Sequence, residues 1–217
     1  MSRAAAPDAD AVEADRQPAL RLVPVPRETE RRLAVYVDLL MKWRRSTNLV
    51  SRSTLTSVWT RHIADSAQLL ALAPDAKIWL DMGTGAGFPG LVIAIQLAGV
   101  PGAVVHCIES DRRKCAFLRE AIRATGACAI VHAARVESVG LAATGLVGAV
   151  TARAFAPLPL TLELANSWLR QGAVGIFPRG RSIDEQVKAF AVPPGYRMEL
   201  IPSLIDKTAM IIRVRIS

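Results

Sequence analysis

Apolar positions recur along the chain with two different periods. In the first third of the chain they follow a three-and-four spacing through Leu33, Tyr36 and Leu40, which predicts an amphipathic helix from Glu28 to Arg45. Further helical turns are expected from Ser53 or Thr54 onward, and from Thr60 through Leu70. The N-terminal part is therefore predicted to be all-helical.

Beyond Pro74, short apolar runs alternate with helical stretches, which is typical of a mainly parallel sheet in an α/β fold. The expected strands are Ile78 to Asp81, Val104 to Glu109, Ala129 to His132, Val147 to Ala152 and Ala173 to Pro178. Two antiparallel edge strands are expected at the end of the chain, Arg197 to Ile201 and Ala209 to Ile216. Helices are expected from Leu91 to Ala98 and after an N-cap formed by Ser110 and Asp111.

These patterns divide the chain into three parts. Residues 1–27 combine prolines and acids with alanines, and they lack the apolar run of a secretory signal, so we expect a loosely ordered leader. Residues 28–73 form the helical extension, and residues 74–217 form the α/β domain. Residues 28–217 are expected to make one compact body.

Composition narrows the class of protein. The 217 residues are 51% hydrophobic and 21% charged, which indicates a globular chain. Its three cysteines, Cys107, Cys115 and Cys128, show no spacing typical of a disulfide framework or a metal site, and they fit a reducing cytoplasm. The uncharged window 82–108 holds six glycines and two prolines, which favours strand, loop and helix over a membrane span.

The net charge of +8 favours a polyanionic partner, with nucleic acid the first choice. Half of this charge lies between Glu28 and Arg61, where seven basic residues face three acids. A plain solvated helix face is the alternative reading of such a run.

A glycine-rich loop follows the first expected strand. Gly83, Gly85 and Gly87 alternate in it, so a ligand can approach the backbone closely. The spacing also fits a dinucleotide loop, but the carboxylate of Asp81 would repel a pyrophosphate and suits the cationic S-adenosylmethionine. Glu109, at the end of the second strand, suits the ribose hydroxyls of either cofactor. No Tyr-x-x-x-Lys pair of a short-chain dehydrogenase is present.

Several motifs together resemble one family. They are Trp43 with Asn48-Leu49, Arg61-His62-Ile63-Ala64-Asp65-Ser66, the loop Leu80-Asp81-Met82-Gly83-Thr84-Gly85-Ala86-Gly87-Phe88-Pro89-Gly90, Arg135-Val136-Glu137 and Arg153-Ala154-Phe155-Ala156. The chain from Tyr36 to Arg213 thereby resembles the bacterial 16S ribosomal RNA guanine-N7 methyltransferases, also called glucose-inhibited division protein B. It departs from the family pattern at Arg44, Thr151 and Arg179-Gly180.

The resemblance implies a class I S-adenosylmethionine-dependent methyltransferase sheet, Rossmann-like, with a helical N-terminal extension. It implies methyl transfer to N7 of a guanine in 16S rRNA of the small ribosomal subunit. Cofactor contacts then carry over to Gly83, Phe88, Val136, Glu137 and Arg153. No metal and no membrane are implied, and we expect a monomer.

Guanine N7 carries a lone pair and no proton, so the reaction needs no general base and His62 has nothing to deprotonate. Catalysis is then mainly positioning, with Arg153 holding the guanine or the cofactor, and with Phe155 either stacking on the base or packing in the core. Phosphate contacts are expected from the clustered arginines, Arg44, Arg45, Arg52, Arg61, Arg179 and Arg181. His106 and His132 lie in expected strands and are read as core residues.

Other functions stay open at this point. One is a methyltransferase of the same class that acts on another RNA, a protein or a small molecule. Another is an RNA-binding assembly factor that keeps the fold without catalysis. An NAD-linked oxidoreductase is disfavoured by Asp81 and by the missing Tyr-x-x-x-Lys pair.

Overall fold

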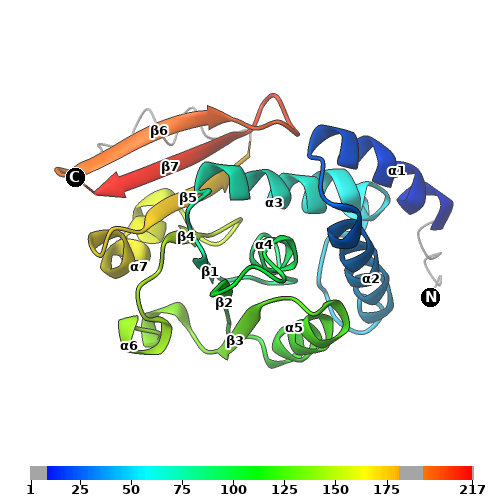
Figure 1. Ribbon diagram of the computed structural model, residues 1–217, viewed down its shortest axis with the longest axis horizontal. Helices are drawn as coiled ribbons and strands as arrows, with labels where there is room; N and C mark the ends of the chain where they lie inside the picture. Colours follow the sequence, from blue (N-terminus) through cyan, green and yellow to red (C-terminus); the bar gives the residue numbers. More distant parts are fainter. Residues whose placement is uncertain (1–8, 181–192, 217) are drawn as a thin grey trace.

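A seven-stranded sheet forms the centre of the molecule, of which the computed structural model describes residues 9–180 and 193–216 (Figure 1). The strand order is β3-β2-β1-β4-β5-β7-β6. The strands are β1 (Ile78–Met82), β2 (Val104–Glu109), β3 (Ala129–Ala133), β4 (Ala149–Thr151), β5 (Val174–Arg179), β6 (Tyr196–Pro202) and β7 (Met210–Ile216). Strands β1 to β5 pair in parallel, whereas β7 pairs antiparallel with both β5 and β6.

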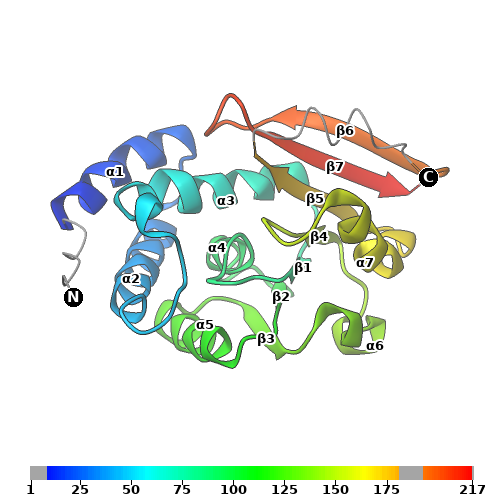
Figure 2. The ribbon, with the colours of Figure 1, turned by 180° about the vertical axis from the view of Figure 1, so that it is seen from behind.

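Helices cover both faces of the sheet, as Figures 1 and 2 show. On one face α2 (Arg27–Trp43), α4 (Gly90–Gln96) and α5 (Arg112–Thr125) pack together, and on the other lie α6 (Leu141–Thr144) and α7 (Leu158–Arg170). Alternation along β1 sends Trp79 into the first core and Leu80 into the second. Because β1 pairs in parallel with β2 and β4, the carboxyl ends of these strands meet at one edge of a doubly wound sheet. Such folds bind their ligands at this edge.

The five parallel strands and the helix expected from residue 28 are confirmed, with bounds that differ by a few residues. The expected C-terminal strands also form, but β7 lies between β5 and β6, so it is not an edge strand. The burial of the two strands agrees with this order. Ile211, Ile212 and Val214 of β7 are buried, whereas β6 has only half-buried and exposed positions.

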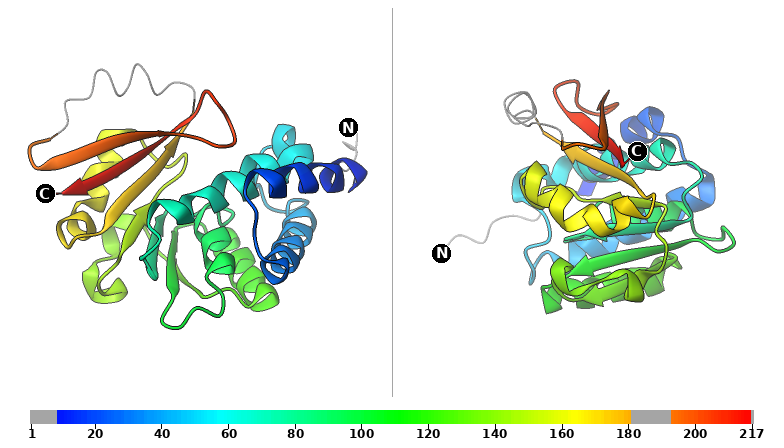
Figure 3. Two further views of the ribbon diagram at one scale, coloured as in Figure 1. Left: turned by 45° about the horizontal axis from the view of Figure 1, so that its top comes forward. Right: turned by 90° about the vertical axis from the view of Figure 1, so that its left-hand side faces the viewer.

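The second helical segment is irregular. It consists of the 3₁₀-helix η1 (Arg52–Ser57), the π-helix η2 (Trp59–Ala64), a short α3 (Asp65–Ala67) and the 3₁₀-helix η3 (Gln68–Leu72). Figure 3 shows the turn of the β6–β7 hairpin close to this segment, and Gln68 donates to Ser203 there. This segment thus connects the rest of the helical extension to the β6–β7 end of the sheet.

The structure differs from the expectation of a loose leader over residues 1–27 at residues 9–22. Helix α1 (Ala9–Leu22) forms and buries Val12 and Ala19 against the helical extension. The prolines and acids that suggested disorder are compatible with a docked helix, because Pro18 lies on its exposed side and Asp15 accepts hydrogen bonds from another element. Within residues 9–180 and 193–216, no helix is long and apolar enough to span a bilayer.

Candidate active site at the carboxyl edge of the sheet

The glycine loop turns directly after β1. Gly83, Gly85 and Gly87 have φ values of 64°, 60° and 100°, which side-chain-bearing residues rarely adopt. The loop is tied to the sheet because the Thr84 N–H donates to the carbonyl of Ile108 at the end of β2 (2.9 Å). These glycines therefore present bare backbone at the carboxyl edge of β1.

Asp81 lies beneath this loop and is fully buried. Its Oδ2 accepts hydrogen bonds from the Thr84 hydroxyl and from the Gly90 N–H (2.9 Å), while its Oδ1 is a buried oxygen without a hydrogen-bond partner in the described structure. Burial raises the pKa of Asp81 to about 7, although the bond from Thr84 opposes this shift. Burial leaves the ionised carboxylate without enough compensating partners. A positive charge at the loop would stabilise it, so the site favours a cationic ligand.

Glu109 ends β2 and fixes the loop from the other side. Its Oε2 accepts from the Gly85 N–H (2.9 Å) and its Oε1 accepts from the Asp111 N–H (2.7 Å). Beyond β3, in the short helix η4 (Val136–Ser138), Val136 is buried and Glu137 is exposed. These three residues are those expected to hold the ribose and adenine parts of the cofactor.

The helical extension reaches into the same loop. The Tyr36 hydroxyl, on α2, donates to the Ala86 carbonyl (2.5 Å). The Phe88 ring packs against Tyr36 at 5.4 Å between centroids and stacks on His62 at 4.9 Å with an interplanar angle of 24°. Residues of the extension therefore shape the cofactor loop directly.

Arg153 follows β4 and is the most highly connected side chain of the site. Its Nη1 donates to Asp65 Oδ2 (3.1 Å) and to the Arg61 carbonyl (3.3 Å), and its guanidinium carbon lies 5.1 Å from the centre of the Phe88 ring. The Arg153–Asp65 pair is partly buried, with side chains 17% and 21% exposed. One arginine thus joins the sheet edge, the cofactor loop and the segment η2–α3.

His62 is held as a neutral acceptor for Arg153. Arg153 Nη2 lies 3.0 Å from His62 Nδ1, and because a guanidinium only donates, Nδ1 accepts. The other ring nitrogen, Nε2, then carries the proton and donates to Thr54 Oγ1 (2.9 Å). Burial and the Arg153 charge lower the pKa of His62 to about 3, so the imidazole stays neutral at physiological pH.

Phe155 lies two residues beyond Arg153 and covers the start of the glycine loop. Between them Ala154 has φ of 49°, an uncommon left-handed conformation for a residue with a side chain. The Phe155 ring packs so closely on Gly83 that a Cβ built there would lie 2.3 Å from its Cδ2. The Arg153–Phe155 turn therefore contacts η2 and α3 through Arg153 and the glycine loop through Phe155.

A cavity of about 410 Å³ opens beside Arg153, within the usual size range of small-ligand sites. Its lining includes charged side chains from several elements. These side chains are Arg61, Asp65, Arg153, Arg179 and Asp206. Arg61 Nη1 and Asp206 Oδ2 lie 3.9 Å apart across it. The turn between β6 and β7 thus contributes a wall that the sequence motifs did not identify.

The arginines expected to contact phosphate differ in how exposed their side chains are. Arg45, Arg52 and Arg61 are exposed, and Arg44 is half-buried at the end of α2. Arg179 instead bonds inward, to the Ala156 carbonyl (2.9 Å) and Thr161 Oγ1 (2.9 Å), which braces the turn after β4. Arg181 lies outside the described residues.

Other candidate chemistry lies away from this edge. His106 Nδ1 and His132 Nε2 are 2.8 Å apart on the neighbouring strands β2 and β3. Cys115 and Cys128 are free thiols, as is buried Cys107. Among residues 9–180 and 193–216 no group of three or more metal-binding side chains occurs.

Sequence reasoning missed Tyr36, Asp65 and Asp206 as parts of the site. Asp65 had a signal, because it belongs to the Arg-His-Ile-x-Asp-Ser motif, one helical turn from Arg61. Tyr36 was read only as part of the apolar stripe of α2, and its hydroxyl contact with Ala86 spans 50 residues. Asp206 lies in a turn without a motif.

S-adenosylmethionine fits the residues present. The side-chain-free glycine cradle admits a ligand to the backbone, and the orphan oxygen of buried Asp81 suits a cationic ligand. Glu109 at the end of β2 and buried Val136 after β3 provide an acceptor and an apolar wall. Gly83, Gly85, Gly87 and Phe88 lie in the loop after β1, and exposed Glu137 lies in η4 after β3.

Comparisons with known proteins agree with this arrangement. The family model described as rRNA small subunit methyltransferase G, GidB, matches residues 29–192. The Ribosomal RNA small subunit methyltransferase G of Bradyrhizobium sp. strain BTAi1 is 51% identical over 176 residues, which cover 81% of this chain and 79% of that protein.

Solved structures share the fold at low identity. A cofactor-bound protein from MTB has a TM-score of 0.60 at 18% identity and covers 99% of both chains. A SAM dependent methyltransferase from Aquifex aeolicus has a TM-score of 0.57 at 14% identity, over 81% of this chain and 97% of that one. The fold is that of class I S-adenosylmethionine-dependent methyltransferases with added N-terminal helices.

Proposed function

The chain belongs to the ribosomal RNA small subunit methyltransferase G family, and on this premise we propose that it transfers a methyl group from S-adenosylmethionine to N7 of a guanine in 16S rRNA. The family named from the sequence motifs is thereby confirmed. The observation that carries the proposal is the position of Arg153, which contacts the Phe88 ring of the cofactor loop and also lines the adjacent cavity.

The proposed cofactor site uses the residues around the glycine loop. Asp81 and the backbone of Gly83 and Gly85 face the cationic part of the cofactor, and Glu109 receives the ribose hydroxyls. Val136 offers an apolar contact to the adenine, with Glu137 as the acceptor for its amino group. When bound, the cofactor supplies an electrophilic methyl group on a sulfonium.

The protein's part in the reaction is positioning. N7 of guanine holds its lone pair in the ring plane and carries no proton, so no residue has to remove one. The neutral state of His62 agrees with this, because its Nδ1 is already an acceptor for Arg153 and its Nε2–H donates to Thr54. Holding the two reactants in line supplies several kcal/mol of the rate enhancement, up to roughly 10 kcal/mol in favourable cases.

We place the target base in the cavity of about 410 Å³ beside Arg153. There the Arg153 guanidinium is available to donate to the guanine O6 edge, next to N7, which is the usual contact of an arginine with guanine. The Phe155 ring now packs on Gly83, and if the ring moves away from Gly83 the base can stack on it.

Exposed arginines on the helical extension support binding to the RNA backbone. Arg45 and Arg52 are exposed, and Arg61 lies at the rim of the cavity. Phosphate contacts of this kind give affinity that falls steeply with salt. We propose that the enzyme works as a monomer on rRNA of the small subunit in the cytoplasm.

The test is product identification. The purified chain is incubated with methyl-labelled S-adenosylmethionine and small ribosomal subunits from cells that lack the modification, and the RNA is digested to nucleosides. We expect label in 7-methylguanosine from 16S rRNA. Label in another nucleoside, or in protein, would move the target elsewhere, and cofactor binding without transfer to any subunit component would favour an assembly factor.

A further inference from the structure

Helix α1 is bonded to the segment that holds Arg153. Asp15, on α1, accepts two hydrogen bonds from one residue of η2, from the Thr60 N–H to Oδ2 (2.9 Å) and from the Thr60 hydroxyl to Oδ1 (2.5 Å). Thr60 is the second residue of η2, in the first turn, where helical N–H groups need partners from outside the helix. Asp15 therefore caps η2 from a different helix, because its carboxylate accepts the bond from a first-turn N–H that an N-cap side chain usually accepts.

The rest of α1 holds Asp15 in place. Ala19 is buried against the helical extension. Arg16, the neighbour of Asp15, forms an ion pair with Glu30 of α2 (2.8 Å) and lies 5.2 Å over the ring of Trp59. Contacts on two elements thus fix the orientation of α1 beside the start of η2.

The next two residues of η2 hold the arginine of the site. The Arg61 carbonyl accepts from Arg153 Nη1 (3.3 Å), and His62 Nδ1 accepts from Arg153 Nη2 (3.0 Å). Because η2 is π-helical, each of its hydrogen bonds spans one residue more than in an α-helix, and such turns are rare and occur frequently at functional sites. A π-turn that loses its cap can relax toward α-helical pairing, which would rotate both acceptors away from Arg153.

We infer that Asp15 is a positioning residue for methyl transfer, acting through Thr60 and η2 on the orientation of Arg153. The inference rests on the proposed function, since the activity it modulates is that of the same site. Helix α1 lies before the segment 29–192 that the family model matches, so this assignment comes from the structure rather than from the family pattern.

Substitution at Asp15 tests the inference in the full-length protein. Asp15→Ala removes both acceptors, and we expect kcat at saturating cofactor and substrate to fall at least fivefold. Asp15→Asn keeps an oxygen for the Thr60 N–H and offers an amide N–H to the Thr60 oxygen, so kcat should stay within about twofold of the wild type. The matched control, Asp38→Ala, removes an exposed carboxylate of the neighbouring helix α2 and should leave kcat unchanged.

A double-mutant cycle separates positioning from general stability. In the Arg153→Lys background the forked contacts to η2 are lost, so Asp15→Ala should then change kcat by less than about 1.5-fold. The same loss in both backgrounds, or an unchanged kcat in Asp15→Ala, would overturn the inference. If Asp15→Ala does not fold, Thr60→Val removes only the hydroxyl bond, and it should lower kcat about twofold with the same coupling to Arg153.

Hydrogen–deuterium exchange provides a readout that does not depend on activity. At a temperature where circular dichroism shows each variant folded, amides of residues 59–64 should exchange at least tenfold faster in Asp15→Ala than in Asp38→Ala. Equal exchange in the two variants would refute the cap. A wild-type chain that forms no 7-methylguanosine would overturn the proposed function, whereas the exchange measurement would still decide the link between Asp15 and η2.

Discussion

Cofactor affinity should depend on pH through Asp81. The carboxyl is fully buried beneath the glycine loop, and burial raises its pKa to about 7. S-adenosylmethionine carries a sulfonium and an ammonium group, and nearby positive charge favours the ionised carboxylate. Binding of the cofactor and loss of the Asp81 proton are therefore linked.

The size of the effect follows from this pKa. If only the ionised form binds, the apparent dissociation constant is multiplied by one plus the ratio of protonated to ionised Asp81. With a pKa of about 7 this factor is roughly 30 at pH 5.5 and about 2 at pH 7.0, so affinity should rise about fifteenfold over that range. The range lies below the titration of a free α-amino group, so the cofactor keeps its charge.

Isothermal titration calorimetry at the two pH values measures this ratio, with Asp81→Asn as the comparison. The amide keeps an acceptor for the Thr84 hydroxyl and the Gly90 N–H but does not titrate, so its affinity should be nearly flat. His62 stays neutral throughout, because its pKa is about 3. Equal pH dependence in the wild type and Asp81→Asn would refute the linkage. Without cofactor, the contribution of Asp81 itself to folding stability is fully present below about pH 4, its unfolded pKa, and is lost as the pH rises through its folded pKa of about 7.

Four further experiments test the cofactor loop, Arg153 and the proposed RNA-binding surface. Gly83→Ala should weaken cofactor binding at least tenfold in calorimetry, since its Cβ would meet Phe155 at 2.3 Å, whereas Gly99→Ala, also at positive φ but in open space, should not. Tyr36→Phe leaves the buried Ala86 carbonyl without its donor and should lower the free energy of unfolding by about 1–2 kcal/mol in urea titrations; no change in midpoint would remove Tyr36 from the loop's support. Arg153→Ala should cut turnover at least tenfold in a methyl-transfer assay, and near-wild-type turnover at saturating cofactor would end its assignment. Reversing the charges at Arg44 and Arg45 should flatten the salt dependence of RNA binding, and an unchanged slope would place the RNA on another face.

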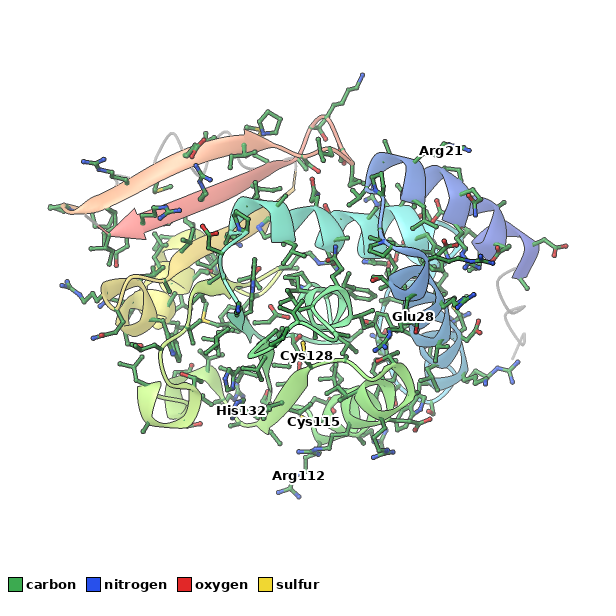
Figure 4. The ribbon with its side chains drawn as sticks, in the orientation of Figure 1. Arg21, Glu28, Arg112, Cys115, Cys128 and His132 are labelled. Carbon is green, nitrogen blue, oxygen red and sulfur yellow. The ribbon has the colours of Figure 1, made fainter. Side chains whose placement is uncertain are left out.

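The parallel core could be predicted from the sequence because its signals are local. Apolar runs gave β1 to β5, and Asp111 caps α5 as expected, accepting from the N–H groups of Arg113 and Lys114. Figure 4 shows the side chain of Arg112 at this helix start pointing away from the body. The glycine loop, Asp81 and Glu109 likewise carry their chemistry in their spacing, and they meet at one edge of the sheet.

What escaped prediction depends on contacts between distant parts of the chain. Helix α1 buries only Val12 and Ala19, and it docks on η2 through the Asp15–Thr60 bonds across 45 positions. Arg179 looks like a surface arginine in sequence, but its donors bond to Ala156 and Thr161. His62 carries no local sign of its tautomer, which the contact with Arg153 fixes.

The central claim is that this site methylates N7 of a guanine in small-subunit rRNA. Ring methylation at N7 makes RNA cleavable at that nucleotide by borohydride reduction followed by aniline. After incubation of unmodified small subunits with the protein and S-adenosylmethionine, we expect one new cleavage position in 16S rRNA, which is at least tenfold weaker with Arg153→Ala at short incubation times. Methyl incorporation into the subunits without any new cleavage position would contradict the claim.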